Sequence, residues 1–153
     1  MNQKETNLGF LLSKATRLIK WEFDKSLKEY TLTTPQWSVL MNLAIEKRQG
    51  ASSNFSAAVL AEQLYMDRPT MSGIIDRLQK KGLLSTKGNP EDRRSQVISL
   101  TKKAMEILPD LQGLSNSIID KATTGFEDEE LKFLKLYLSK LINNLSYETK
   151  EDK

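Results

Sequence analysis

The stretch VLAEQLYMDRPTMSGIIDRLQKKGL, residues 59–83, decides the fold. It predicts two short helices joined by a turn at residues 65–68. Ser56 is placed to cap the first helix, Pro69 stands at the start of the second, where its missing N–H costs nothing, and Gly82 stands at its end. The apolar side chains of each helix share one face: Leu60, Ala61 and Leu64 in the first, and Met71, Ile74, Ile75 and Leu78 in the second.

A β-hairpin is predicted directly after this pair of helices. The side chains of residues 84–87 and 96–100 alternate in character as those of strands do. The Gly, Asn and Pro between these segments favour a turn whose tip carries Arg93 and Arg94. Two helices with a short turn, followed by a hairpin, form a winged helix, in which the second helix enters the major groove of DNA. We therefore expect a mainly α fold of the α+β winged-helix kind, with the hairpin as its wing.

Amphipathic helices are predicted on both sides of the winged helix. An apolar stripe with helical spacing covers residues 8–30, and a further helix opens with Thr34 as its cap. After the hairpin, Thr101 can cap a helix in which Pro109 should cause a kink or a restart. A last helix opens with the acidic residues 127–130, which suit the positive end of a helix dipole.

We expect one domain over residues 4–147, followed by a charged tail at residues 148–153. Residues 34–103 would form the DNA-binding lobe, and helices at 4–31 and 104–147 would form a dimerisation part. A single copy would leave several leucines of these terminal helices poorly covered: Leu8, Leu11, Leu134, Leu138, Leu141 and Leu145. We therefore expect a homodimer, whose two recognition helices would lie about 34 Å apart.

The composition excludes several classes of protein. The 153 residues contain neither cysteine nor histidine. Without cysteine there is no disulfide framework, thiolate zinc site, iron–sulfur cluster or thiol redox switch. Without imidazole, catalytic triads and most transition-metal chemistry are excluded as well. We expect no cofactor and no metal.

An enzyme is not expected either. The best candidates are the Ser-x-x-Lys spacing of Ser99 and Lys102 and the acid pair Glu91 and Asp92. The first lies where a strand meets a helix cap and the second lies on a turn, where carboxylates are usually solvated. No apolar run is long enough to cross a bilayer, so we expect a cytoplasmic protein without a membrane partner.

Positive charge is concentrated in residues 68–103. This segment carries nine Lys or Arg and three acids, a net charge of +6, whereas the whole chain has a net charge of +3 and the other residues therefore sum to −3. Such asymmetry is typical of a face that binds a polyanion, although a solvated charged surface has the same composition.

On the second helix of the pair, small hydroxyl and basic side chains lie opposite the apolar stripe. Hydroxyl groups near its start can reach base edges or phosphates, and later basic groups can neutralise the DNA backbone. A hairpin tip can place arginine in the minor groove. The candidate DNA contacts are Arg68, Thr70, Ser72, Arg77, Lys80, Arg93 and Arg94. The alternatives are an ion pair for Arg77, solvated lysines and an ordinary charged turn.

Several motifs together resemble the MarR family of bacterial transcriptional regulators. They are VLAEQL at residues 59–64, DRPTMS at 67–72, IDRLQKKGL at 75–83, DRRSQVISLT at 92–101 and TTPQWSVL at 33–40. The resemblance implies a homodimeric winged-helix repressor or activator that binds a palindromic operator and is often released by a small ligand. It also implies groove and phosphate contacts by Arg68, Thr70, Ser72 and Arg77, with Arg94 as the wing arginine.

The chain departs from the family pattern in the turn and on the recognition helix. Tyr65 stands where glycine is common in the turn, so the angle between the two helices can differ. Gly73 stands where a basic residue is common, so one phosphate contact is in doubt, and Ala104 replaces a frequent glycine.

A ligand site is the last expectation. In folds of this kind ligands lodge between the DNA-binding lobe and the dimer helices. The candidates for an aromatic pocket with a cation for an acidic compound are Arg17, Trp21, Tyr30 and Trp37, with core packing as the alternative for the tryptophans.

We expect a sequence-specific transcriptional repressor that binds double-stranded DNA. The alternative is a winged-helix adaptor that binds protein through the same face.

Overall fold

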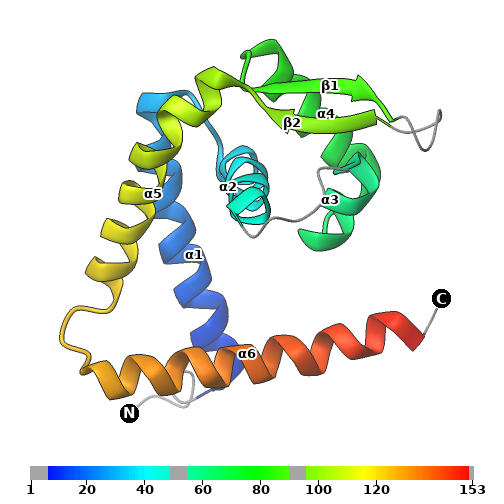
Figure 1. The fold of residues 1–153 in the computed structure, drawn as a ribbon. Coiled ribbons are helices and arrows are strands. Elements are labelled where there is room, and N and C mark those ends of the chain that lie inside the picture. The colour runs from blue at the N-terminus through cyan, green and yellow to red at the C-terminus, as the bar shows by residue number, and fades with distance from the viewer. Residues whose placement is uncertain (1–6, 49–54, 90–95, 152–153) are drawn as a thin grey trace. The chain divides into compact units, whose positions relative to one another are not determined.

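The computed structural model describes residues 7–48, 55–89 and 96–151, and only the backbone of residues 147–151. Within these residues the chain forms six α-helices, one short 3-10 helix and a two-stranded antiparallel hairpin (Figure 1). The predicted mainly α fold with a hairpin wing is confirmed. The chain divides into two compact units, Met1–Ile118 and Ile119–Lys153. No helix in the described ranges combines the length and apolar character that a membrane span requires.

The first unit begins with a long helix that ends in a tighter turn. Helix α1 (Leu8–Ser26) is capped by Asn7, whose side chain accepts the N–H of Phe10 at 2.9 Å. The chain continues as the 3-10 helix η2 (Leu27–Tyr30), so the predicted helix over residues 8–30 has the right extent but a 3-10 last turn. Thr31 ends η2 with a φ of 54°, in the left-handed region that β-branched residues rarely adopt.

Helix α2 (Thr34–Arg48) begins with a reciprocal cap. The N–H of Thr33 donates to Oε1 of Gln36 at 3.2 Å, and the N–H of Gln36 lies 3.5 Å from Oγ1 of Thr33. The prediction that Thr34 is the cap was therefore wrong by one residue. The hydroxyl of Thr34 instead donates to Oδ1 of Asp24 at 2.6 Å, which ties the start of α2 to α1.

The winged helix follows as predicted. Helix α3 (Ala57–Gln63) is capped by Ser56, whose Oγ accepts the N–H of Val59 at 3.3 Å. Helix α4 (Arg68–Lys80) packs against α3. Strands β1 (Leu84–Gly88) and β2 (Gln96–Leu100) pair from Leu84 opposite Leu100 to Gly88 opposite Gln96. Figure 1 shows this hairpin beside α3 and α4.

Two residues with positive φ shape the ends of α3 and α4. Tyr65, in the turn between the helices, has a φ of 50°, a conformation that the glycine common at this position adopts without strain. Gly82 follows α4 with a φ of 70°. Its N–H donates to the carbonyl of Gln79 at 2.8 Å, and the N–H of Leu83 donates to the carbonyl of Leu78 at 2.9 Å. This pair of bonds is a Schellman motif, which ends the helix and favours glycine.

One hydrophobic core holds α4 in place. It joins buried side chains from α1, η2, α2, α3, α4, both strands and α5. Its largest fully buried side chains are Leu27, Val39, Leu40, Leu60, Met71, Leu78 and Leu111. The inner face of α4 therefore packs against most of the unit, which fixes the direction of its outer face.

Helix α5 (Lys102–Ala122) follows the hairpin and is capped by Thr101, whose Oγ1 accepts the N–H of Ala104 at 3.2 Å. Pro109 lies inside α5, and the helix does not restart there. The second unit contains the last residues of α5, a turn at Gly125 with a φ of 86°, and α6 (Asp128–Glu151). Three acids open α6, as predicted for the positive end of a helix dipole.

Candidate nucleic-acid interface

Helix α4 has one buried face and one exposed face. Met71, Ile74, Ile75 and Leu78 are buried in the core. The five candidate DNA contacts of this helix are all exposed: Arg68, Thr70, Ser72, Arg77 and Lys80. Arg77 forms no ion pair with another described residue, so the alternative of a paired Arg77 finds no support within the described ranges. The exposed face presents three cations and two hydroxyls.

The N-terminal end of α4 is held by Asp67. One carboxylate oxygen accepts the backbone N–H of Thr70 at 2.7 Å, and the other accepts the hydroxyl of Thr70 at 2.7 Å. The hydroxyl bond, followed by the backbone bond, lowers the pKa of Asp67 below the ordinary value of an aspartate. Because the only hydroxyl proton of Thr70 is directed at Asp67, Oγ1 of Thr70 faces solvent as an acceptor. Such an acceptor suits an amino group of a base better than a phosphate oxygen.

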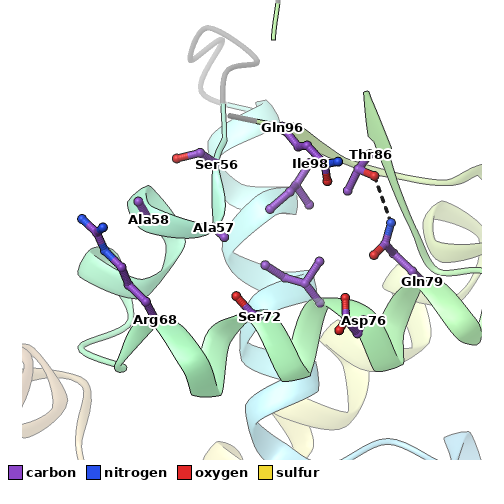
Figure 2. A pocket seen from close by; sticks show the side chains of 11 residues that line it. Ser56, Ala57, Ala58, Arg68, Ser72, Asp76, Gln79, Thr86, Gln96 and Ile98 are labelled. Atoms are coloured by element: carbon purple, nitrogen blue, oxygen red, sulfur yellow. Dashed lines mark hydrogen bonds between the residues drawn. The ribbon is translucent and has the colours of Figure 1, made fainter. Parts of the chain in front are cut away.

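A cavity of about 350 Å³ lies between the exposed face of α4, the start of α3 and the hairpin. Figure 2 shows Arg68, Ser72, Asp76 and Gln79 of α4 beneath residues of the hairpin and of the start of α3. Ile75 and Ile98 add apolar walls, and Nε2 of Gln79 donates to Oγ1 of Thr86 at 3.0 Å, which links the wing to α4. Two of the candidate DNA contacts, Arg68 and Ser72, therefore line a hollow with apolar walls that also contains one carboxylate, that of Asp76.

The tip of the wing lies outside the described residues. Arg93 and Arg94, and the acid pair Glu91 and Asp92, all fall in this segment. Their roles stay as predicted from the sequence. Lys87, in β1, is the exposed cation closest to the tip in the described part of the wing.

The four candidate ligand residues belong to the first unit but differ in exposure. Arg17 and Trp21 are exposed on α1, and Nζ of Lys25 lies 5.7 Å from the centre of the Trp21 ring. Tyr30 and Trp37 are half-buried and pack against the core. The ring of Trp37 lies 4.6 Å from that of Phe23, and no residue of this set lines the cavity beside α4.

The remaining catalytic candidates are exposed. Ser99 lies in β2 opposite Ser85, and Lys102 is the first residue of α5. Neither residue lines the cavity described above. Among the described residues, no group of His, Cys, Asp or Glu side chains could hold a metal ion.

Two contacts of α4 were missed from the sequence. Gln79 bonds the wing, and Nζ of Lys81 donates to the main chain of Thr31, fifty residues earlier. The sequence gives no local signal for either contact, because each partner lies on a different element and is a common polar residue.

Comparison with known proteins agrees with this geometry. The profile of the MarR family matches residues 30–95, which include α2, α3, α4 and β1. A MarR protein from Peptoclostridium difficile is similar in structure, with a TM-score of 0.86 at 22% identity, over 100% of this chain and 96% of that one.

Two further solved structures have bound partners. S. aureus MepR in complex with DNA has a TM-score of 0.79 at 20% identity, over 90% of this chain and 98% of that one. CouR from Rhodococcus jostii bound to p-coumaroyl-CoA has a TM-score of 0.78 at 22% identity, over 92% and 95%. At these identities the likeness establishes the fold. The profile match shows that residues 30–95 are similar to the MarR family of transcriptional regulators.

Proposed function

We propose that this protein is a repressor that binds double-stranded DNA as a homodimer, at a palindromic operator, through α4 and the wing. One observation carries the proposal: α4 is anchored by a buried face and presents three cations, two hydroxyls and other polar groups, including one acid, Asp76, on the other. A helix that is fixed in this way can enter a major groove without losing the core contacts that orient it. A regulator of this kind works on DNA in the cytoplasm.

Each contact has a chemical role. Thr70 and Ser72, near the N-terminal end of α4, read base edges, and Arg68, Arg77 and Lys80 bind phosphates. Arg93 and Arg94 on the wing enter the minor groove, where the negative potential is concentrated. Because phosphate contacts carry most of the affinity and base contacts carry the specificity, variants of the two groups should behave differently.

Exposed apolar side chains support a homodimer. Leu8 and Leu11 on α1 are exposed, as are Leu134, Leu138 and Leu145 on α6. Large apolar side chains in contiguous stripes are typical of a surface that another molecule covers. We propose residues 34–103 as the DNA-binding lobe and the helices at 4–31 and 104–147 as the dimerisation part. Two-fold symmetry would then present two copies of α4 to successive turns of one DNA face.

A small acidic aromatic compound is the proposed effector. Nε1 of Trp37 and Oδ1 of Asn42 are buried and have no hydrogen-bond partner among the described residues. Since an unsatisfied buried donor is costly, a ligand acceptor at Trp37 would be favourable. Tyr30 packs on the same core, and Arg17 and Trp21 on α1 would supply a cation and a further ring. In CouR the bound compound is p-coumaroyl-CoA. Without cysteine, any such release must be non-covalent.

The test is selection of duplexes from a randomised library by the purified protein. We expect enrichment of a palindromic sequence whose half-sites lie about one helical turn apart, and a complex with two chains per duplex by light scattering. The matched control is a duplex of the same composition in scrambled order. Failure to enrich any sequence, with a monomer in solution, would contradict the proposal and favour the adaptor that binds protein.

A further inference from the structure

The two adjacent lysines at the end of α4 have different environments. Lys80 is exposed and has no hydrogen-bond or ion-pair partner in the described part of the chain. Nζ of Lys81 donates to the carbonyl oxygen of Thr31 at 2.5 Å and lies 3.1 Å from Oγ1 of the same residue. From the sequence both lysines belong to the same basic stretch, and the structure separates them.

Thr31 is a suitable acceptor because of its unusual backbone. Its φ of 54° places it in the left-handed region as the residue that ends η2. The last carbonyl groups of a helical turn lack partners within the helix and carry partial negative charge, so a cation is favourable there. Lys81 thus caps the end of η2 with an ammonium group that belongs to the recognition helix.

Side chains at the start of α5 bind the carbonyl groups of Lys81 and Gly82, just after α4. Nζ of Lys103 donates to the carbonyl of Lys81 at 2.8 Å, and the hydroxyl of Thr101 donates to the carbonyl of Gly82 at 2.7 Å. The end of α4 is therefore bonded to the turn after η2 on one side and to the start of α5 on the other. Lys81 and Lys103, two cations of the basic segment 68–103, are therefore bonded within the protein.

We infer that Lys81 is a positioning residue that fixes the C-terminal end of the recognition helix against Thr31, whereas Lys80 binds DNA phosphate. The division of roles rests on the proposed function, but the contact itself does not. Nζ of Lys81 lies within hydrogen-bond distance of both the carbonyl oxygen and Oγ1 of Thr31, so the ammonium group is held against the protein surface. A lysine that binds phosphate must be free to reach along the backbone, which is the situation of Lys80.

The two roles predict different responses to salt. Each phosphate contact contributes roughly 0.9 to the slope of log affinity against log salt concentration. Lys80→Met should therefore lower this slope by about 1, for selected and scrambled duplexes alike. Lys81→Met should leave the slope unchanged and weaken binding to the selected duplex about five- to tenfold, and binding to the scrambled duplex less. The base contacts that distinguish the two duplexes need α4 in its binding position, which it would occupy for a smaller fraction of the time.

The experiment compares the two methionine variants of the full chain by fluorescence anisotropy between about 50 and 200 mM KCl. The probes are the duplex that the wild type selects and its scrambled counterpart, and urea unfolding establishes the folded fraction of each variant. A variant that is only less stable would have a smaller fraction of folded protein. Its affinities for the selected and the scrambled duplex would then fall by the same factor, so their ratio would not change. A slope that falls by about 1 in Lys81→Met would overturn the inference, since Lys81 would then be a phosphate contact.

A measurement on the free protein keeps this test separate from the proposed function. We expect the amino nitrogen signal of Lys81 to be protected from solvent exchange in a lysine-selective NMR spectrum, and that of Lys80 to be unprotected. In Lys81→Met, the amide signals of Thr31 and Leu83 should shift. If the protein selects no duplex, the proposed function fails. The NMR signals of the free protein still show whether Lys81 contacts Thr31. Equal exchange at the two lysines would refute the positioning role.

Discussion

A matched pair of glycine substitutions, one in the interior of α4 and one just after its C-terminal end, should change stability in opposite directions. Gly73 lies in the interior of the helix and has no positive φ, and a Cβ built there would lie 3.7 Å from Nη2 of Arg77, an ordinary contact. Gly82 follows the helix with a φ of +70°, and a Cβ there would meet nothing closer than Cδ of Lys103 at 3.9 Å. Neither site is crowded, so backbone conformation decides both outcomes.

The magnitudes follow from that difference. Replacing a helix-interior glycine with alanine stabilises by about 1 kcal/mol, so Gly73→Ala should raise the free energy of unfolding by that amount and the Tm by about 2–4 °C. At Gly82 an alanine would be forced into the left-handed region at a cost of about 1–2 kcal/mol, partly offset by a less flexible unfolded chain. Gly82→Ala should therefore destabilise by about 1 kcal/mol.

Urea unfolding followed by circular dichroism measures both changes in unfolding free energy. The dependence of that free energy on urea concentration should be the same in wild type and variants. Gly73→Asn and Gly82→Asn are the controls, because asparagine is a poorer helix former than alanine but tolerates the left-handed region. Gly82→Asn should then be milder than Gly82→Ala, whereas Gly73→Asn should gain less than Gly73→Ala. A change of the same sign in the two alanine variants would refute the assignment of Gly82 as the helix terminator.

Three further substitutions test the site and its support. Leu78→Ala, in a fully buried position, should cost about 2–5 kcal/mol of unfolding free energy, and a loss below about 1 kcal/mol in urea would contradict the packing of α4. Asp67→Ala should lower stability at neutral pH. Because folding lowers the pKa of Asp67, its stabilising contribution is present above the ordinary aspartate pKa and is lost as the pH falls through the folded pKa. The unfolding free energies of wild type and variant should therefore converge in acid. A constant difference between them down to about pH 2 would exclude this role. Arg94→Ala should weaken binding to the selected duplex by roughly 1–3 kcal/mol and scrambled duplex by less, as anisotropy titrations can show; equal binding by variant and wild type would remove Arg94 from the interface.

Local signals predicted the winged helix well. Ser56 caps α3 and Thr101 caps α5, as expected, because a cap depends on residues three positions apart. The strand at residues 96–100 and the end of α4 at Gly82 were also predicted. Alternation of apolar and polar side chains within a strand, and the preference of glycine for the positive φ that ends a helix, are both local signals.

Contacts between distant segments were not predictable in the same way. Either Thr33 or Thr34 could cap α2, and the choice depends on Asp24, which draws the hydroxyl of Thr34 to α1. Pro109 does not restart α5, and burial of Leu108 and Leu111 beside it is worth about 2 kcal/mol per side chain, enough to offset a lost helix bond. The bond from Lys81 to Thr31 spans fifty residues and has no sequence pattern.

The salt dependence of duplex binding tests the central claim, that the exposed face of α4 binds DNA, most directly. The measurement is the affinity of wild type and Arg77→Ala for the selected and scrambled duplexes over a range of KCl concentrations. We predict a steep linear fall of log affinity with log salt for the wild type, and for Arg77→Ala a weaker affinity for both duplexes with a slope smaller by about 1. A wild-type affinity that hardly responds to salt, or an Arg77→Ala variant indistinguishable from wild type on both duplexes, would contradict it.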